Sequence, residues 1–212
     1  HIADDQITLA KMAGGTDGNI ISYDASGDPV AIATGNDGQL LTSTGAGSPP
    51  AFEDAPAGGL SAASQWRVTA NFTGDAAPIA SNWEEADAPT SFGILGSSMT
   101  ESSGVFTFPS TGYWLITAQV EWQSNNDGNY NSVAIYTTHD NSTYAEAAEC
   151  KDVSGKSGTY YSGIHCSYIF DVTSTSNCKC AMYLYQQVDA NTTLGGTDSH
   201  KTGLTFIKLG DT

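Results

Sequence analysis

The sequence predicts an all-β protein in which a short stalk of β repeats precedes a larger antiparallel sandwich or barrel. Three observations support this prediction. The composition is poor in helix formers and rich in Gly, Ser, Thr, Asn and Tyr, with 23 Gly among 212 residues. An ungapped repeat occupies residues 15–54. The segment 113–122 alternates apolar and polar residues with period two, as a half-buried strand does.

The N-terminal part is predicted to be a lead-in segment (1–14) followed by two stalk repeats (15–54). GTDGNIISYDASGDPVAIAT from Gly15 aligns without gaps with GNDGQLLTSTGAGSPPAFED from Gly35. Each copy has an Asp-Gly turn, a short apolar strand, a Gly/Pro turn and a second strand. A repeat of about 20 residues cannot bury its own core, and two copies are fewer than the three or so that a solenoid needs. We therefore expect subunits to intertwine through Ile20, Ile21, Leu40 and Leu41; the alternative is a flexible linker with chance similarity.

A Pro/Gly/Ala-rich hinge (55–63) separates the stalk from a head domain (64–212). The head contains all four Trp and nine of the ten Tyr, all but Tyr23. Eight or more strand candidates without a helical period predict a sandwich or barrel. The candidates are 65–72, 92–95, 104–108, 113–122, 132–138, 144–149, 159–171, 179–187 and 202–209.

The strand pair within 104–123 is predicted to be the centre of the head. Pro109 and Gly112 belong to the turn between its two strands. After the turn, one face carries only apolar residues, which are Trp114, Ile116, Ala118, Val120 and Trp122. Two indoles on one face of one strand indicate a thick core on that side.

The charge balance excludes several classes of partner. The chain has 7 Lys+Arg against 23 Asp+Glu, and its net charge is −16. Without a basic patch, neither nucleic acid nor an anionic membrane surface is an expected partner. Membrane insertion is not expected either, because no apolar run approaches the roughly 20 residues of a membrane span. No signal peptide is visible, and a chain that starts at His1 is expected to be a fragment or a processed product.

The cysteines and the motif search indicate neither a metal site nor an enzyme. Cys166, Cys178 and Cys180 alternate in phase with core residues, so buried free thiols are favoured over disulfides, and Cys150 is out of phase. The SGKS segment at 154–157 lacks the first glycine of a phosphate-binding loop, and NNDGNYN at 125–131 lacks the outer ligands of a calcium loop. The four histidines are scattered. We therefore predict no catalytic residues, no metal and no cofactor.

Three segments resemble known families. GVFTFPSTGYWLITAQVEW resembles the strand pair of complement-head and tumour-necrosis-factor-like jelly rolls. The closing segment GLTFIKLGDT is similar to the last core strand of those jelly rolls and to the closing strand of tailed-phage fibre proteins. The repeat at 15–54 resembles the stalk repeat of phage and prophage fibres. The first match rests on Phe106, Phe108, Pro109, Gly112 and Tyr113.

The resemblance implies a homotrimeric virion fibre or spike, with a stalk followed by an antiparallel jelly-roll head, on a capsid or tail surface. Its implied partners are other copies of itself, other virion proteins at the N-terminal end, and a host cell-surface receptor, with glycans among the candidates. The alternatives are a purely structural decoration protein of the capsid or tail, and a secreted carbohydrate-binding module. The sequence has no collagen-like tail, which argues against a complement-type protein.

The longest polar loops are predicted to lie together at the distal tip of the head. Successive loops of a jelly roll alternate between its two ends, and the family pattern returns the C-terminus to the stalk end. Loops 124–131, 150–158 and 188–201 then fall at the tip, and 109–112, 139–143 and 172–178 at the stalk end. Since binding residues commonly lie on loops held by a rigid scaffold, we predict receptor contacts in the tip loops. The candidates are Asn125, Asn126, Asp127, Tyr130, Lys156, Thr193, Asp198 and His200.

Overall fold

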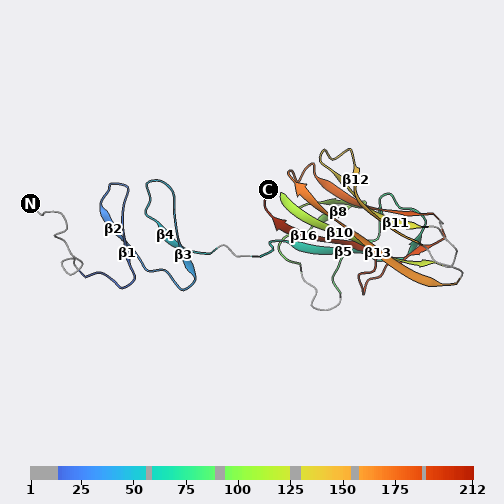
Figure 1. Ribbon diagram of the computed structural model, residues 1–212, viewed down its shortest axis with the longest axis horizontal. Helices are drawn as coiled ribbons and strands as arrows, with labels where there is room; N and C mark the ends of the chain where they lie inside the picture. Colours follow the sequence, from blue (N-terminus) through green and yellow to red (C-terminus); the bar gives the residue numbers. More distant parts are fainter. Residues whose placement is uncertain (1–13, 56–58, 89–93, 125–129, 154–157, 188–189) are drawn as a thin grey trace, which may run out of the picture. The chain divides into compact units, whose positions relative to one another are not determined.

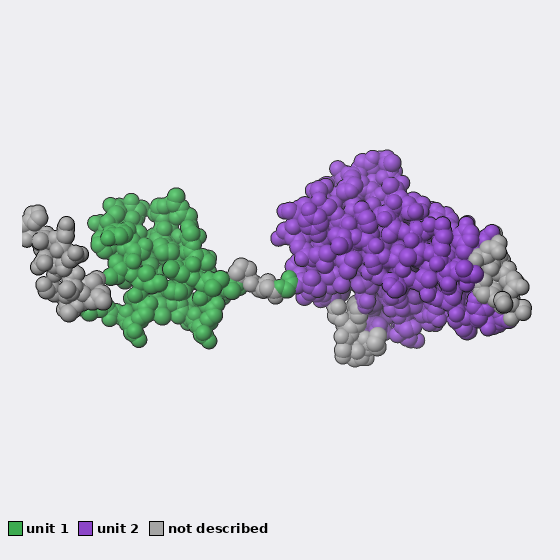
Figure 2. Space-filling model, in the orientation of Figure 1, with its two compact units in different colours: residues 1–59 green, residues 60–212 purple. Residues whose placement is uncertain are grey.

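The computed structural model describes residues 14–55, 59–88, 94–124, 130–153, 158–187 and 190–212, and this part of the chain contains strands and no helix. It divides into two compact units, His1–Gly59 (unit 1) and Leu60–Thr212 (unit 2), which are coloured separately in Figure 2. Each unit is described by itself.

Unit 1 consists of two antiparallel hairpins, one for each sequence repeat (Figure 1). The first joins β1 (Ile20–Tyr23) to β2 (Pro29–Ile32), and the second joins β3 (Gln39–Thr42) to β4 (Ala51–Asp54). The turn of the first hairpin forms because the Asp24 carboxylate accepts the backbone N–H groups of Ser26 and Asp28 at 2.8 and 3.0 Å. Neither hairpin has a second layer of its own chain against it among the described residues, so most of its side chains are exposed.

Unit 2 is an antiparallel sandwich of two sheets. The first sheet has seven strands: β13 and β16 flank the long strand β10, and β5, β6, β7 and β15 complete it. The second sheet has the order β12-β11-β14-β9-β8. Figure 1 shows β10, β13, β16 and β5 running along the length of the unit. The bounds are β5 Ala63–Val68, β6 Phe72–Thr73, β7 Trp83–Glu85, β8 Thr100–Ser102, β9 Val105–Thr107, β10 Gly112–Ser124, β11 Asn131–Thr138, β12 Ala145–Asp152, β13 Tyr160–Val172, β14 Lys179–Gln186, β15 Thr192–Thr193 and β16 Gly203–Gly210.

The core lies between the two sheets and follows the predicted alternation. Along β10 every second side chain, from Trp114 to Trp122, is buried. Aromatic rings from β9, β5 and β16 meet in the middle of the sandwich: Phe106 lies 5.6 Å from Trp66 and 5.3 Å from Phe206 between ring centroids. Cys166, Cys178 and Cys180 are buried free thiols, as predicted, while Cys150 is only partly buried. The apolar pattern of the sequence is therefore sufficient to define this core.

One predicted strand of the head is wrong in part. Residues 92 and 93 lie outside the described residues, and Leu95 forms only an isolated bridge with Ala63, through N–H···O bonds of 2.9 and 3.0 Å. Ile94 and Leu95 are exposed, so their apolar side chains do not enter the core. The short apolar run was predicted to be a strand, but a strand needs several paired residues and here only Leu95 is paired.

Candidate functional site

The strand register brings the strand ends that border loops 124–131 and 150–158 to one end of the sandwich, as predicted, whereas 188–201 departs from the prediction. At one end of the sandwich lie the strand ends that lead into loops 124–131, 152–160 and 186–192. The residue pairs that show this are Ser124 with Tyr160, Asn131 with Asp152, and Asn131 with Gln186. At the opposite end, Gly112 pairs with Val172 and Thr138 with Lys179. The chain enters unit 2 toward that opposite end, where Ala63 pairs with Ile207.

Half of the predicted receptor contacts can be placed in the structure. Asn125, Asn126, Asp127 and Lys156 lie outside the described residues. Tyr130 and Asp198 are exposed, as a surface contact requires. The two remaining candidates, Thr193 and His200, are not where the loop argument placed them.

Thr193 is completely buried, so its predicted exposure is wrong. It belongs to the short strand β15, in which it pairs with Trp122 of β10 and Phe72 of β6. Its hydroxyl accepts a hydrogen bond from Gln186 Nε2 at 2.9 Å. The stretch 188–201 is therefore not one loop, because two of its residues form a strand that extends the first sheet.

His200 is partly buried beside the first sheet rather than exposed at the tip. The segment before it follows β10 back from the tip, since Leu194 N–H donates to the Glu121 carbonyl at 2.9 Å and the Gln119 side chain donates to the His200 carbonyl. Burial, with a smaller contribution from the positive charge of Arg67, lowers the pKa of His200 below 6.5. The imidazole is therefore neutral at pH 7 and does not supply positive charge for an anionic ligand.

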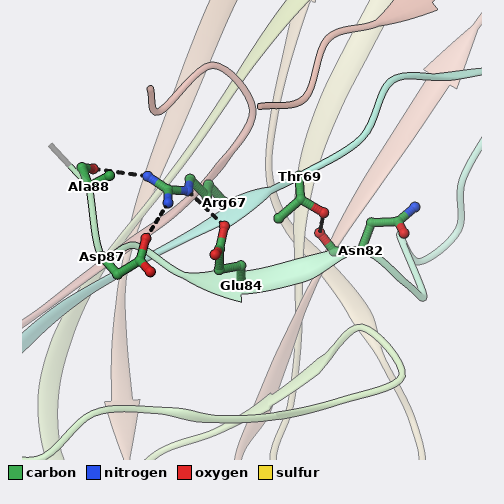
Figure 3. A network of polar contacts seen from close by, with 6 residues as sticks. All are labelled: Arg67, Thr69, Asn82, Glu84, Asp87 and Ala88. Atoms are coloured by element: carbon green, nitrogen blue, oxygen red, sulfur yellow. Dashed lines mark hydrogen bonds and ion pairs between the residues drawn. The ribbon is translucent and has the colours of Figure 1, made fainter. Parts of the chain in front are cut away.

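Arg67 is the centre of a buried polar network that organises this side of the sandwich (Figure 3). Its guanidinium donates to Glu84 at 3.1 Å, to Asp87 at 2.6 Å and to the Ala88 carbonyl at 2.9 Å. Close by, the hydroxyl of Thr69 donates to the Asn82 carbonyl at 3.1 Å. The partners of Arg67 are two carboxylates and a carbonyl of the same chain, so the network is structural and holds the segment 84–88 against β5.

Potential metal ligands do not cluster among the described residues. No group of three or more His, Cys, Asp or Glu side chains within them could hold a metal ion. The one Cys–His contact joins Cys178 Sγ and His139 Nδ1 at 3.5 Å. A reactive thiol must be accessible, and Cys178 is completely buried. This pair is therefore part of the packing.

The outward side of the seven-stranded sheet carries an apolar row that no described residue covers. On β10, Leu115 pairs with Ile169 of β13 on one side and with Ile207 of β16 on the other. Ile169 is 56% exposed, and Tyr113 and Leu209 nearby are also exposed. We call the outward side chains of β10, β13 and β16 the open face.

Further along the open face, the rows become polar but remain uncharged. Thr117 lies between Ser167 and Thr205, and the hydroxyls of Thr117 and Ser167 are 3.0 Å apart. The next row pairs Gln119 with His165. Three successive rows therefore carry no formal charge with histidine neutral, although the chain as a whole has a net charge of −16.

The outward side of the five-stranded sheet carries a groove lined by tyrosines and polar groups. Tyr130 and Tyr185 line it together with Ser132, Glu149 and Asp75. Tyr130 is a predicted contact, whereas Tyr185 was not predicted. The signal for Tyr185 was the alternation of Tyr183 and Tyr185 with the buried Met182 and Leu184. We call this feature the tyrosine groove.

The predicted stalk contacts are exposed in the single chain. Ile20 and Ile21 lie on β1, and Leu40 and Leu41 lie on β3. The contacts that they would make with other copies remain a prediction.

No family model and no curated protein matches the chain. A crystal structure of murine APRIL at pH 8.5 is similar, with a TM-score of 0.50 and 11% identity, over 70% of this chain and 98% of that chain. Eiger TNF from S. frugiperda is also similar, with a TM-score of 0.49 and 13% identity, over 71% of this chain and 93% of that chain. A second structure of murine APRIL, at pH 8.0, has a TM-score of 0.48 and 13% identity, over 70% of this chain and 99% of that chain. At such low identity the likeness shows the fold, a tumour-necrosis-factor-like jelly roll, and nothing about function.

Among the described residues there is no helix with the length and apolar character needed to cross a bilayer.

Proposed function

We propose that this chain is a non-enzymatic virion structural protein, a homotrimeric fibre or spike whose jelly-roll head mediates attachment to a host cell surface. The order of parts supports the proposal: repeat hairpins in unit 1 precede a single jelly roll in unit 2. The virion role itself rests on the resemblance of residues 15–54 to fibre stalk repeats. The assembly rests on the open face.

The open face is the observation that carries the proposal. A contiguous exposed apolar patch on a β sheet commonly marks a contact with another protein. Here the patch combines the exposed Ile169 with Leu115 and Ile207 on neighbouring strands. Chains with a charge of −16 repel one another, so copies can approach best through a surface without formal charge. The rows of the open face at Leu115, Thr117 and Gln119 satisfy both conditions, while Asp171 and Glu121 lie in the rows that flank them. The occupant that fits these three rows is therefore a second copy of the chain.

Unit 1 supports the same occupant. Its hairpins expose Ile20, Ile21, Leu40 and Leu41, and a hairpin pair of this size is not independently stable in water. Intertwined copies would cover these side chains and the open face in one assembly. The number three comes from the resemblance to fibres and trimeric jelly rolls, which is an analogy at the level of fold.

Sedimentation equilibrium of the full chain tests the assembly. We expect a mass of three times 22.1 kDa. Ile169→Asp, which places a charge in the apolar row, should give monomers at concentrations where the unmodified chain is trimeric. Val153→Asp is the matched control, because Val153 is an apolar residue that is 71% exposed and lies outside the open face. A folded monomer of the unmodified chain would refute the assembly.

Attachment is tested on particles that carry the chain. Antibody fragments against unit 2 should label the particles and block their adsorption to cells. Labelling without any effect on adsorption would favour the decoration protein, and the absence of labelling would contradict a virion role.

A further inference from the structure

The tyrosine groove contains a buried polar group without a partner. Ser132 is only 1% exposed, and its Oγ has no hydrogen-bond partner among the described residues. The residue lies on β11 between Lys151 of β12 and Tyr185 of β14, and it lines the groove. A buried hydroxyl without a partner is costly, so its place at the base of a groove points to a ligand group that would satisfy it.

The carboxylates of the groove are compensated locally. Glu149 forms an ion pair with Lys151 at 2.9 Å, and Asp75 accepts the backbone N–H of Gln186 at 2.6 Å. Each carboxylate has further lone pairs that can accept hydrogen bonds. Lys151 offsets the charge of Glu149, and the backbone N–H of Gln186 already binds one oxygen of Asp75, so the remaining lone pairs suit uncharged hydroxyl donors. They also repel anions, as the overall charge of −16 does.

The aromatic side chains extend beyond the groove as a row along β14 and β11. The ring of Tyr185 lies 6.5 Å from that of Tyr183, and Tyr183 stacks on Tyr136 at 4.0 Å, between centroids. The cross-strand neighbours of these tyrosines are small: Tyr183 of β14 pairs with Ala134 of β11, and Tyr136 of β11 pairs with Ala181 of β14. At the groove itself, Lys151 Nζ lies 5.5 Å from the centre of the Tyr130 ring. The surface therefore offers several partly exposed aromatic side chains in a line.

We propose that the tyrosine groove binds a neutral oligosaccharide. Sugar hydroxyls would donate to Glu149 and Asp75 and pair with the Ser132 hydroxyl, while the apolar C–H faces of the sugar would contact tyrosine rings. The length of the tyrosine row indicates more than one sugar unit. The biological meaning of this site, recognition of a cell-surface glycan, rests on the attachment function proposed above, whereas the binding itself does not.

The experiment is a binding titration of the full chain with defined soluble glycans. The probes are neutral oligomers of glucose, galactose, mannose and N-acetylglucosamine, from mono- to hexasaccharides, beside sialylated glycans and oligolysine. We expect binding to at least one neutral series, with affinity that rises from the mono- to the trisaccharide. Binding to none of the neutral series, or stronger binding to sialylated glycans or oligolysine, would overturn the proposal.

Three variants locate the site. Tyr185→Ala should weaken binding by about tenfold, because truncating an aromatic contact at a binding centre commonly has an effect of this size. Ser132→Ala should weaken it by about fivefold, while leaving the melting temperature of the unliganded chain unchanged or higher, since it removes an unsatisfied buried hydroxyl. Tyr183→Ala should reduce mainly the gain in affinity with oligomer length. Tyr23→Ala, an exposed tyrosine of unit 1, is the control and should bind normally.

If the Tyr185→Ala and Ser132→Ala chains both bind the saccharide as tightly as the unmodified chain does, the saccharide binds elsewhere and this site is refuted. The outcome is distinguishable from failure of the proposed function. If antibody fragments block adsorption but the chain binds no neutral saccharide, only the present inference fails. If the chain binds saccharides through the groove but is absent from particles, only the virion role fails.

Discussion

Removing the two carboxylate partners of Arg67 should destabilise unit 2 more than removing Arg67 itself. The Arg67 side chain is 1% exposed, whereas the side chains of Glu84 and Asp87 are 31% and 74% exposed. Arg67→Met keeps most of the packing of the aliphatic stem and leaves two carboxylates that water can reach. It loses the hydrogen bond to the Ala88 carbonyl, so we expect a loss of about 1–2 kcal/mol.

The double variant Glu84→Ala/Asp87→Ala instead leaves the guanidinium buried with one carbonyl as its acceptor. Uncompensated buried charges typically cost 3–5 kcal/mol, and the partial exposure of Glu84 places this site at the lower end, about 3 kcal/mol. Adding Arg67→Met to the double variant removes the uncompensated charge. We therefore expect the triple variant to be more stable than the double variant.

Urea unfolding followed by tryptophan fluorescence measures these differences, because all four Trp lie in unit 2 and two of them, Trp66 and Trp83, adjoin Arg67 and Glu84 in sequence. Protein concentration must be equal in all samples, since assembly adds to apparent stability. A triple variant that is less stable than the double variant would refute the argument. So would a loss for Arg67→Met that equals or exceeds that of the double variant.

Three further predictions concern single residues of unit 2. The pKa of His200 is lowered below 6.5 in the folded state, so the unfolded state binds more protons as the pH falls below 6.5, and stability should decrease there. His200→Gln should flatten this part of the curve of melting temperature against pH. An unchanged slope would contradict the prediction. Burial raises the pKa of Cys166 to about 12, so iodoacetamide at pH 8 should modify the partly buried Cys150 and spare Cys166 until the protein unfolds, as peptide mass spectrometry can show. Gly104→Ala should cost at least about 2 kcal/mol in urea unfolding, because Gly104 has φ 82° and a Cβ there would lie 2.2 Å from the Ile79 carbonyl oxygen; wild-type stability would show that the turn can rearrange.

The elements that the sequence predicts best are those whose evidence is local. The alternation from Trp114 to Trp122 defines both the strand β10 and its buried face, because successive side chains of a strand point to opposite sides. The same reasoning places Cys166 and Cys180 in the core. Each hairpin of unit 1 likewise follows from turn residues and apolar pairs within one repeat.

The candidate sites were predictable only in part, because each depends on which strands become neighbours. The alternation of loops predicted which of them share an end of the sandwich. It also predicted that 188–201 is a single loop with Thr193 exposed, whereas Thr193 is buried and pairs with β10 and β6. The groove required Tyr130, which precedes β11, and Tyr185 of β14 to come together around Ser132, and no spacing in the sequence predicts this arrangement.

Period-two patterns and turn residues act over a few neighbouring positions, so they were sufficient to predict the all-β class, the hairpin repeats, the central strand and its buried side. Three features follow from the packing of distant strands: Arg67 is buried among acceptors, His200 lies beside β10, and the Ser132 hydroxyl has no partner among the described residues. The physical reason is that the burial of a polar group depends on the atoms packed around it, and in an antiparallel sandwich those atoms come from strands distant in the sequence.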